Sequence, residues 1–330
     1  MRFGSRAASI YRTAVRRGIL KSMPTQSVKR GQRPPMNPAV KIGALVLGAV
    51  VVVAVLVLAA RGLRSLDAVE QFIQRYPGTS EPPAFSEPGF PLWVRITHYL
   101  NFLFILLLMR SGMEKRAIGA RKHPAYWTPS KRGGRKIPFL LWWHQFVDVL
   151  WVVNGLVYVV LLFSTGRWGR LVPTSWDVFP NAVSAGLQYL SLDWPLTESW
   201  AAYNSLQLLT YFVVVFIAAP LAIISGLRLS SFWPKDAPKL NKVVSAKVAR
   251  GLHFPLAVVF VGFVVFHVFL VFTTGMRQNL NHMFAGTADT SWVGFWGFVI
   301  STVVAVGLTA AATTPVLRPI AATHGKVTTR

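Results

Sequence analysis

Histidine is the residue type in this sequence that could carry metal or redox chemistry. Four of the seven histidines lie in or at the ends of long apolar segments, at positions His98, His144, His253 and His267. An imidazole is a common ligand for transition metals, and ionisable groups inside a membrane are costly and usually functional. Taken singly, each histidine is explained equally well as a polar residue near a membrane surface. Their spacing along the chain distinguishes the two explanations.

The chain contains no cysteine, which limits the sites that these histidines could form. Without thiols there are no disulfides, thiolate–metal sites, cysteine-bound iron–sulfur clusters or covalently attached c-type haems. The loops also show no Ser-His-Asp set and no phosphate-binding loop. We therefore expect no independent catalytic site for substrate chemistry in this chain.

Six apolar segments are long enough, at about 20 residues, to cross a bilayer as helices. Only 14% of the residues are charged, against about 25% in a typical soluble protein, which excludes an ordinary soluble enzyme. The predicted spans cover approximately residues 42–60, 92–109, 137–163, 200–226, 252–272 and 292–316. The elements that must position the histidines are therefore transmembrane helices.

Lysine and arginine are unevenly distributed between the connecting segments, and this predicts the orientation of the spans. Segments 1–41, 110–136, 228–250 and 318–330 carry ten, nine, six and three of them, with two acidic residues in all. The rest of the chain carries seven basic and nine acidic residues, of which Arg95 and Asp148 lie within spans. Basic loops stay in the cytoplasm, so we expect a plasma-membrane protein with both termini inside. The net charge of +24 is then mainly a topology signal, with some attraction to lipid headgroups, and no nucleic-acid partner is expected.

With this orientation the four histidines fall at two depths. His144 and His253 lie near the inner ends of their spans, whereas His98 lies near the outer end of its span. His267 follows His253 by 14 residues, which places it about 21 Å further along the helix. Fourteen residues are close to four helical turns, so both histidines share one helix face. The sequence therefore predicts an inner pair, His144 and His253, and an outer pair, His98 and His267.

Each predicted pair comes from two different helices, so its imidazoles can approach opposite faces of one flat macrocycle. This arrangement is bis-histidine ligation of two stacked b-type haems in a helix bundle. We therefore predict an all-α integral membrane protein with a haem-binding four-helix bundle, an N-terminal anchor helix and a C-terminal helix. Arg95 could pair with a haem propionate, and Asp148 could orient His144. Snorkelling of the arginine and helix pairing by the aspartate explain these two residues equally well.

The pattern resembles the membrane di-haem cytochrome b subunits of formate dehydrogenase, nickel–iron hydrogenase and thiosulfate reductase. The resemblance covers about residues 91–274, and the paired histidines are its specific part. It rests on Arg95-x-x-His98, Ser111-Gly112, His144, Asn154-Gly155, Ser225-Gly226 and His253-x13-His267. The segment His123-Pro124-x-Tyr126-Trp127 is most similar to the thiosulfate-reductase branch, which is often associated with molybdopterin enzymes.

This resemblance implies the same pairing of histidines and adds a quinone beside the outer haem. The positions that match the quinone site are Asn204, near the outer start of a span, and Gln278, eleven residues past His267. It also implies a catalytic oxidoreductase partner, of the molybdopterin type in the most similar branch. The best-known members lead from a cytoplasmic N-terminus directly into the first haem helix. Because an anchor precedes that helix here, the charge distribution predicts a bundle turned over relative to theirs.

The prediction divides the chain into five parts. These are a basic, disordered cytoplasmic arm (1–41), an anchor helix (42–60), an outer connector (61–91), a di-haem bundle (92–317) and a cytoplasmic tail (318–330). The expected function is electron transfer across the membrane between a catalytic oxidoreductase subunit and the quinone pool. Two alternatives stay open: a stand-alone transmembrane haem reductase, and a haem-free transporter or assembly factor. The reductase folds tend to carry two histidines on each of two helices, whereas here a single helix carries two.

Overall fold

The computed structural model describes residues 37–119, 123–129, 135–194, 199–234 and 236–329. Almost all of the predicted N-terminal arm, 1–41, lies outside these residues. The chain divides into two compact units, residues 1–54 and 55–330. The described part of the first unit is the N-terminal portion of helix α2 (Pro38–Arg64), and the histidine-bearing helices all belong to the second unit.

Six helices are long and apolar enough to cross a membrane, which confirms the predicted all-α integral membrane fold. They are α2, α4 (Leu92–Ile118), α5 (Phe139–Ser164), the continuous helix α7–α8 (Ser205–Leu229), α10 (Ala246–Thr273) and α12 (Val293–Ala311). Several run further than their apolar segments. Helix α4 continues past Met109 into a basic stretch, where Arg110 pairs with Glu114 one turn later at 2.8 Å. A helix satisfies its own backbone hydrogen bonds, so it need not end where the apolar sequence ends.

The fourth span contains a wider turn in its middle. It comprises α7 (Ser205–Val213), the π-helical turn η2 (Val214–Ala218) and α8 (Ala219–Leu229). Pro220 follows this turn and lacks the N–H group that a regular α-helix would use there. The span begins at Ser205 rather than at Trp200 because Asn204 caps it. The cap fixes where the backbone turns into the membrane.

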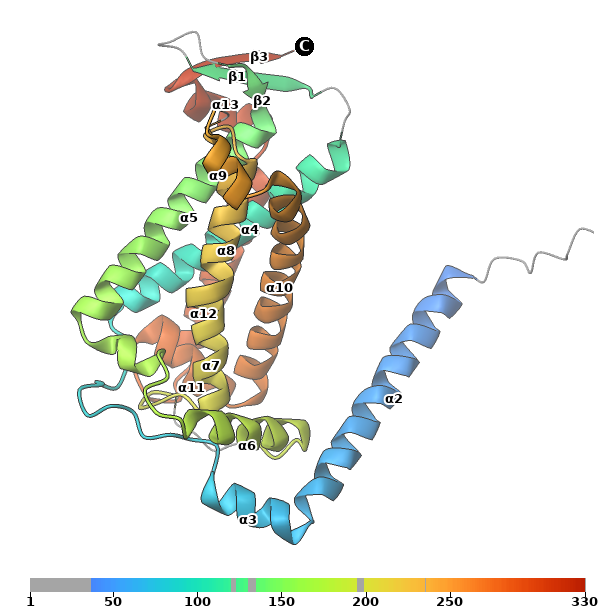
Figure 1. The fold of residues 1–330 in the computed structure, drawn as a ribbon, viewed down its shortest axis with the longest axis vertical. Helices are drawn as coiled ribbons and strands as arrows, with labels where there is room; N and C mark the ends of the chain where they lie inside the picture. The colour runs from blue at the N-terminus through green and yellow to red at the C-terminus, as the bar shows by residue number, and fades with distance from the viewer. Residues whose placement is uncertain (1–36, 120–122, 130–134, 195–198, 235, 330) are drawn as a thin grey trace, which may run out of the picture. The chain divides into compact units, whose positions relative to one another are not determined.

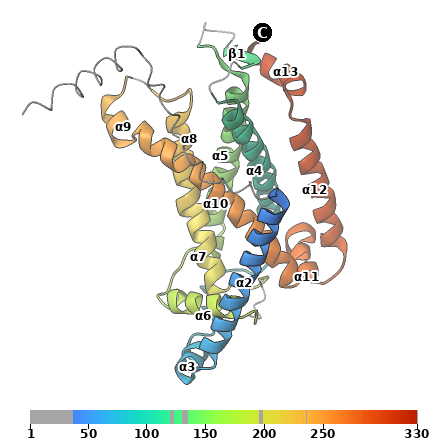
Figure 2. The same ribbon diagram turned by 90° about the vertical axis from the view of Figure 1, so that its right-hand side faces the viewer.

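Helices α4, α5, α7–α8 and α10 form a bundle that carries the candidate site (Figure 1). Within it, α4 packs mainly against α5, and α8 packs mainly against α10. Helix α12 lies along α4 on the outside of the bundle (Figure 2). Arg110 donates from α4 to the carbonyl oxygens of Thr309 and Ala310 on α12. The α4–α5 pair therefore faces the α8–α10 pair, and the four histidines lie between them.

One end of the bundle carries a small antiparallel sheet that the all-α prediction did not include. Its strands β1 (Ala125–Pro129), β2 (Ile137–Pro138) and β3 (Gly325–Thr329) lie in the order β2-β1-β3. Strand β3 and helix α13 (Thr314–Ala322) occupy most of the segment expected to be a tail. Trp127 of β1 stacks on Trp142 at 5.9 Å and donates its indole N–H to the carbonyl of Ala321. The C-terminal segment, with α13 and β3, therefore closes one end of the bundle.

This end also carries helix α9 (Pro238–Val243), so three of the four basic segments gather here in the described part of the chain (Figure 1). The opposite end of the second unit carries the shorter elements. These are α3 (Asp67–Arg75), the 3-10 turn η1 (Arg167–Arg170), α6 (Val178–Leu190), α11 (Met276–Leu280) and the π-turn η3 (Asn281–Ala285). The predicted connector 61–91 thus includes a helix. We refer to the two ends as the inner end, with the sheet, and the outer end.

Candidate functional site

The structure brings the four span histidines together as two pairs. His98 of α4 faces His267 of α10 with a distance of 6.2 Å between ring centroids. His144 of α5 faces His253 of α10 at 6.4 Å. These are the pairs that the depth argument predicts, and each combines two helices. The first pair lies toward the outer end and the second toward the inner end.

The distances within the pairs fit a metal held linearly between two imidazoles. Metal–imidazole bonds are about 2 Å long, and a ring nitrogen lies about 1 Å from its ring centre, so the centroids need to be roughly 6 Å apart. Among the described residues, no cluster of three or more His, Asp or Glu side chains could hold a metal ion. A bare ion would therefore lack ligands, whereas haem iron receives four from its macrocycle and needs two axial ones. The residues present fit haem b.

Each histidine of the inner pair is oriented by a serine from a facing helix. The Ser111 hydroxyl of α4 lies 2.8 Å from Nδ1 of His144. The Ser225 hydroxyl of α8 lies 3.2 Å from Nδ1 of His253. Both hydroxyls also donate to carbonyl oxygens of their own helices, at Leu107 (2.8 Å) and Ala222 (3.1 Å) respectively.

These contacts favour one tautomer of the two inner rings. Since each serine O–H donates to a carbonyl, the serine oxygen is free to accept a hydrogen bond from the histidine Nδ1–H. Nε2 is then left unprotonated and directed away from the serine, as a metal ligand requires. The sequence shows both Ser-Gly pairs, but the helix that each one faces follows from the tertiary structure.

The glycine after each serine lies against the same imidazole. A Cβ atom placed on Gly112 would meet Cε1 of His144 at 3.5 Å, an ordinary contact. A Cβ atom placed on Gly226 would meet Cε1 of His253 at 3.1 Å, which is tighter than normal packing. The Ser-Gly pairs thus combine a hydrogen-bond acceptor with room for the ring, and the requirement for glycine is stricter at position 226.

Asp148 does not take the orienting role suggested by its spacing from His144. Its Oδ2 atom lies 3.8 Å from Nε2 of His144, beyond hydrogen-bond distance and beside the nitrogen that would face a metal. Ser111 holds the other ring nitrogen instead. The i,i+4 spacing correctly brings the aspartate near the ring, but it does not determine which nitrogen is approached.

The outer pair is surrounded by rings rather than by hydroxyl groups. Phe263 stacks on His267 with an interplanar angle of 15° and centroids 5.6 Å apart. Tyr211 of α7 meets His267 edge-on at 6.2 Å. On α4, the carbonyl of Thr97, the residue before His98, accepts a hydrogen bond from Asn154 of α5 at 3.0 Å. Asn154 therefore joins α4 to α5 beside the outer pair.

Arg95 joins two parts of the outer end through main-chain carbonyl groups. Its Nε donates to the carbonyl of Met283 at 3.1 Å, and its Nη2 donates to that of Phe284 at 2.8 Å. The free carbonyl groups at the C-terminal end of η3 are a favourable site for a cation. The guanidinium packs closely against Gly286, where a side chain would collide with it. In this structure Arg95 anchors η3 to α4.

Asn204 is fully buried and serves as the N-cap of α7. Its Oδ1 accepts from the main-chain N–H of Gln207 at 2.9 Å, and the Gln207 side chain bonds back to the Asn204 N–H. Its Nδ2 donates to the Tyr189 hydroxyl, also at 2.9 Å. Both polar groups of the side chain are thus used within the protein. Gln278 lies in the short helix α11, which follows α10 at the outer end.

A buried arginine that the sequence analysis did not select lies at the outer end. Arg170 of η1 is 6% exposed and donates to the carbonyls of Gly89 and Ser199, each at 2.7 Å. Its guanidinium carbon lies 5.0 Å from the ring centres of both Phe90 and Tyr203. Burial raises the pKa of Tyr203, although the Arg170 charge acts in the opposite direction. The signal in the sequence is weak: Arg170 is one of the few basic residues outside the basic segments.

Comparison with known proteins adds independent information about this region. The family profile described as prokaryotic cytochrome b561 matches residues 89–286. A protein of Azospira oryzae, provisionally named protein-methionine-sulfoxide reductase subunit YedZ1, is 29% identical over 191 residues, covering 55% of this chain and 88% of the relative. No solved structure matches the chain with statistical significance. The profile match includes both histidine pairs and excludes the N-terminal anchor.

Proposed function

This chain belongs to the prokaryotic cytochrome b561 family, and on that premise we propose that it is a two-haem electron carrier. Members of the family are membrane proteins that bind haem b and transfer electrons. The narrower assignment, to subunits like those of formate dehydrogenase or nickel–iron hydrogenase, is part of the proposal. In it, one haem b is bound by His98 and His267, and a second by His144 and His253.

The observation that carries the proposal is the presence of two histidine pairs at different levels of one bundle. Both pairs have the separation of axial ligands, and α10 supplies one ligand to each. The 14-residue interval along α10 separates the two levels by about 21 Å. The edges of two macrocycles are closer than their centres, so this spacing suits electron transfer over most of the bilayer.

The protein's own contribution is to fix ligands and exclude water. The inner serines keep a proton on Nδ1 of His144 and His253 and leave Nε2 available as ligand. Phe263 and Tyr211 restrict the rotation of the His267 ring. Haem iron, when bound, supplies the one-electron chemistry, and its potential is set by ligand identity, hydrogen bonding and burial.

We further propose that electrons pass between the quinone pool and a catalytic oxidoreductase partner, of the molybdopterin type that the sequence resemblance implies. The name of the Azospira oryzae relative, a reductase subunit, supports a partner with its own catalytic site. We place the quinone contact at Gln278, the position eleven residues past His267 that the sequence resemblance indicates; the Asn204 side chain is bonded within the α7 cap and to Tyr189. The expected location is the plasma membrane with both termini cytoplasmic, supported by the basic segments at the sheet end.

A reduced-minus-oxidised optical spectrum of the purified chain, with haem quantified as its pyridine complex, tests the proposal. We expect two haems b per chain. One haem per chain would contradict the assignment of both pairs, and a folded preparation without haem would favour the transporter or assembly-factor alternative.

The quinone contact is tested separately by Gln278→Ala. We expect slower reduction of the haems by a water-soluble quinol, with Asn204→Ala as a matched control that leaves this rate unchanged. Unaltered kinetics in Gln278→Ala would contradict the quinone position without affecting the haem assignment.

A further inference from the structure

Arg170 carries a buried positive charge for which the described residues provide no carboxylate. We propose that it is the binding partner of a haem propionate at the outer histidine pair. This inference rests on the proposed haem function and assigns a residue that neither the sequence pattern nor the family match selects. It differs from the sequence expectation, in which Arg95, one turn before His98, could pair with a haem propionate.

The hydrogen bonds of Arg170 are incomplete for a residue so deeply buried. Two of its N–H groups reach the carbonyls of Gly89 and Ser199, and its Nε is buried without a hydrogen-bond partner. A guanidinium has five N–H donors and retains its charge in proteins. The faces of Phe90 and Tyr203 stabilise a cation, but they do not neutralise it. A buried charge without a counter-charge is strongly destabilising, so an anion is expected beside it.

Other arginines of the outer end show how this protein pairs a guanidinium. Arg167, three residues earlier in η1, binds the Glu87 carboxylate at 3.2 Å, and Arg64 binds Asp193 at 2.5 Å. Both of those carboxylates are exposed. Arg170 is the more buried residue, yet it takes part in no ion pair with a described residue. Arg170 therefore lacks a counter-charge among the described residues; Glu198, directly before Ser199, lies outside them, and a bound group would supply the anion.

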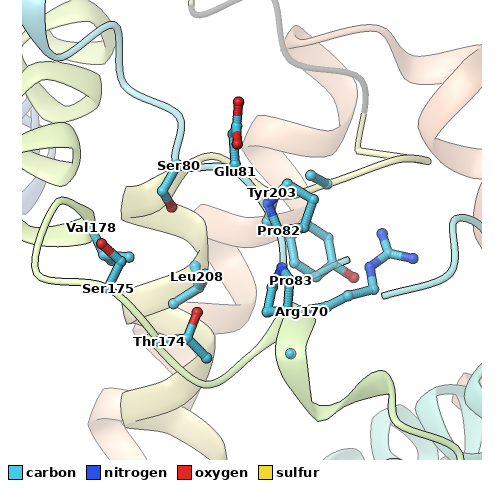
Figure 3. A pocket seen from close by; sticks show the side chains of 12 residues that line it. Ser80, Glu81, Pro82, Pro83, Arg170, Thr174, Ser175, Val178, Tyr203 and Leu208 are labelled. Carbon is cyan, nitrogen blue, oxygen red and sulfur yellow. The ribbon is translucent and has the colours of Figure 1, made fainter. Parts of the chain in front are cut away.

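The cavity beside Arg170 is too small to admit an organic anion from outside. Its volume is about 20 Å³, space for about one water molecule. Figure 3 shows Arg170 and Tyr203 at this cavity, with Glu81 on the other side of the Tyr203 ring. Glu81 is exposed and makes no ion pair with Arg170. A haem propionate would instead reach Arg170 from the side of the bundle.

Successive ring contacts connect Arg170 with the outer histidine pair. Its guanidinium lies over Tyr203, the Tyr203 ring is 4.9 Å from the ring of Tyr211, and Tyr211 contacts His267. Haem is a flat group with its two carboxylates on one edge. Among the described residues of the outer end, Arg170 is a buried cation without an ion-pair partner, and a propionate carboxylate matches the planar, paired donors of a guanidinium. Arg95 instead uses its donors on the carbonyls of Met283 and Phe284.

The test is optical redox titration of the purified full-length protein and its Arg170→Gln variant. Removing a cation near the haem favours the oxidised, more positive iron. We expect the ratio of reduced to oxidised haem at a fixed ambient potential to fall roughly tenfold, which is about 59 mV for a one-electron couple. The shift in midpoint potential should be confined to the spectral component of the haem that is lost in the His98→Ala variant. Loss of that haem alone would also support the proposal, and Arg170→Lys should restore most of the potential.

Arg167→Gln is the matched control, because Arg167 also binds the 87–89 segment but has its own carboxylate. It should change the ratio by less than about twofold. An Arg170→Gln variant with unchanged potentials would overturn the proposal.

An anionic lipid phosphate is the alternative source of the anion. If wild type and variant differ only when phosphatidylglycerol is added to the detergent, the lipid is the partner and the proposal is wrong. A wild-type chain without haem would instead refute the proposed function itself.

Discussion

The two histidine pairs have nearly equal ring separations but different surroundings. At the inner pair each Nδ1 contacts a serine hydroxyl from a facing helix, followed in sequence by a glycine that leaves room for the ring. At the outer pair, no hydrogen bond between described residues reaches either imidazole, and His267 is held by Phe263 and Tyr211. The inner rings are thus oriented by hydrogen bonds, and the outer pair depends on ring packing.

If both pairs bind haem as proposed, one cofactor type is positioned in two ways within a single bundle. A hydrogen bond to Nδ1 fixes the tautomer and raises the basicity of the ligating nitrogen. Ring packing restricts the orientation of an imidazole, but it does not determine which ring nitrogen carries the proton. The two proposed haems are therefore expected to respond differently to substitutions around them.

The largest expected effect is the loss of a whole haem. Alanine at His98 or His267 should remove one and the same haem, and alanine at His144 or His253 should remove the other, because in the proposed arrangement each pair supplies both axial ligands of one iron. Optical spectra and haem content measure this directly. The control is His282→Ala, which changes a buried histidine outside both pairs and should retain two haems. If His98→Ala and His144→Ala removed the same haem, the pairing would be wrong.

The next effect separates the two modes of orientation. Ser111→Ala or Ser225→Ala should weaken binding of the inner haem by roughly tenfold or more, since the hydrogen-bond partners of ligating histidines typically contribute that much. The outer haem should be unaffected. Haem retention during dilution, followed separately for the two spectral components, would show this. Equal losses from both components would mean that the serines act on the stability of the bundle as a whole.

A smaller effect compares the two halves of the inner pair. Gly226→Ala places a methyl group 3.1 Å from the His253 ring, whereas Gly112→Ala meets His144 at 3.5 Å. We expect Gly226→Ala to displace its imidazole and alter the electron paramagnetic resonance signal of the inner oxidised haem. Gly112→Ala should leave that signal close to wild type. The opposite order would contradict the packing described for these helices.

The smallest effect concerns hydrogen bonds at the outer end that hold helices rather than rings. Asn204→Ala removes the N-cap of α7 and should lower stability by about 1 kcal/mol, seen as a lower thermal midpoint. The midpoint potentials of both haems should stay unchanged, because the cap contacts Gln207 and Tyr189 rather than a paired histidine. A shifted outer potential would show that the cap also positions that pair.

The spans and the histidine pairing could be predicted because they depend on regularities along the chain. Hydropathy locates the helices, and the 14-residue interval between His253 and His267 determines both depth and helix face. Helix ends were less predictable, since α4 and α10 continue into polar sequence where backbone bonding and capping, rather than hydropathy, decide.

Features that depend on distant segments could not be predicted in the same way. Strands β1 and β3 are about 200 residues apart in the sequence and only five residues long each, too short for a periodic signal. The partner of each Ser-Gly pair lies on another helix, so its role appears only in three dimensions. Arg170 resembles any loop arginine in the sequence, and its burial results from the packing of Phe90 and Tyr203 around it.

His253 and His267 lie at different depths along α10, so an electron passing between haems bound there would move along the membrane potential. A displacement of about 21 Å between the two levels covers about two thirds of a hydrocarbon layer of roughly 30 Å. One charge crossing the full layer changes in energy by about 2.3 kcal/mol per 100 mV. An electron moving between the two levels would therefore gain or lose about 1.6 kcal/mol at that potential, enough to shift its distribution about fifteenfold. The membrane potential itself would then act as a regulator of which haem is reduced.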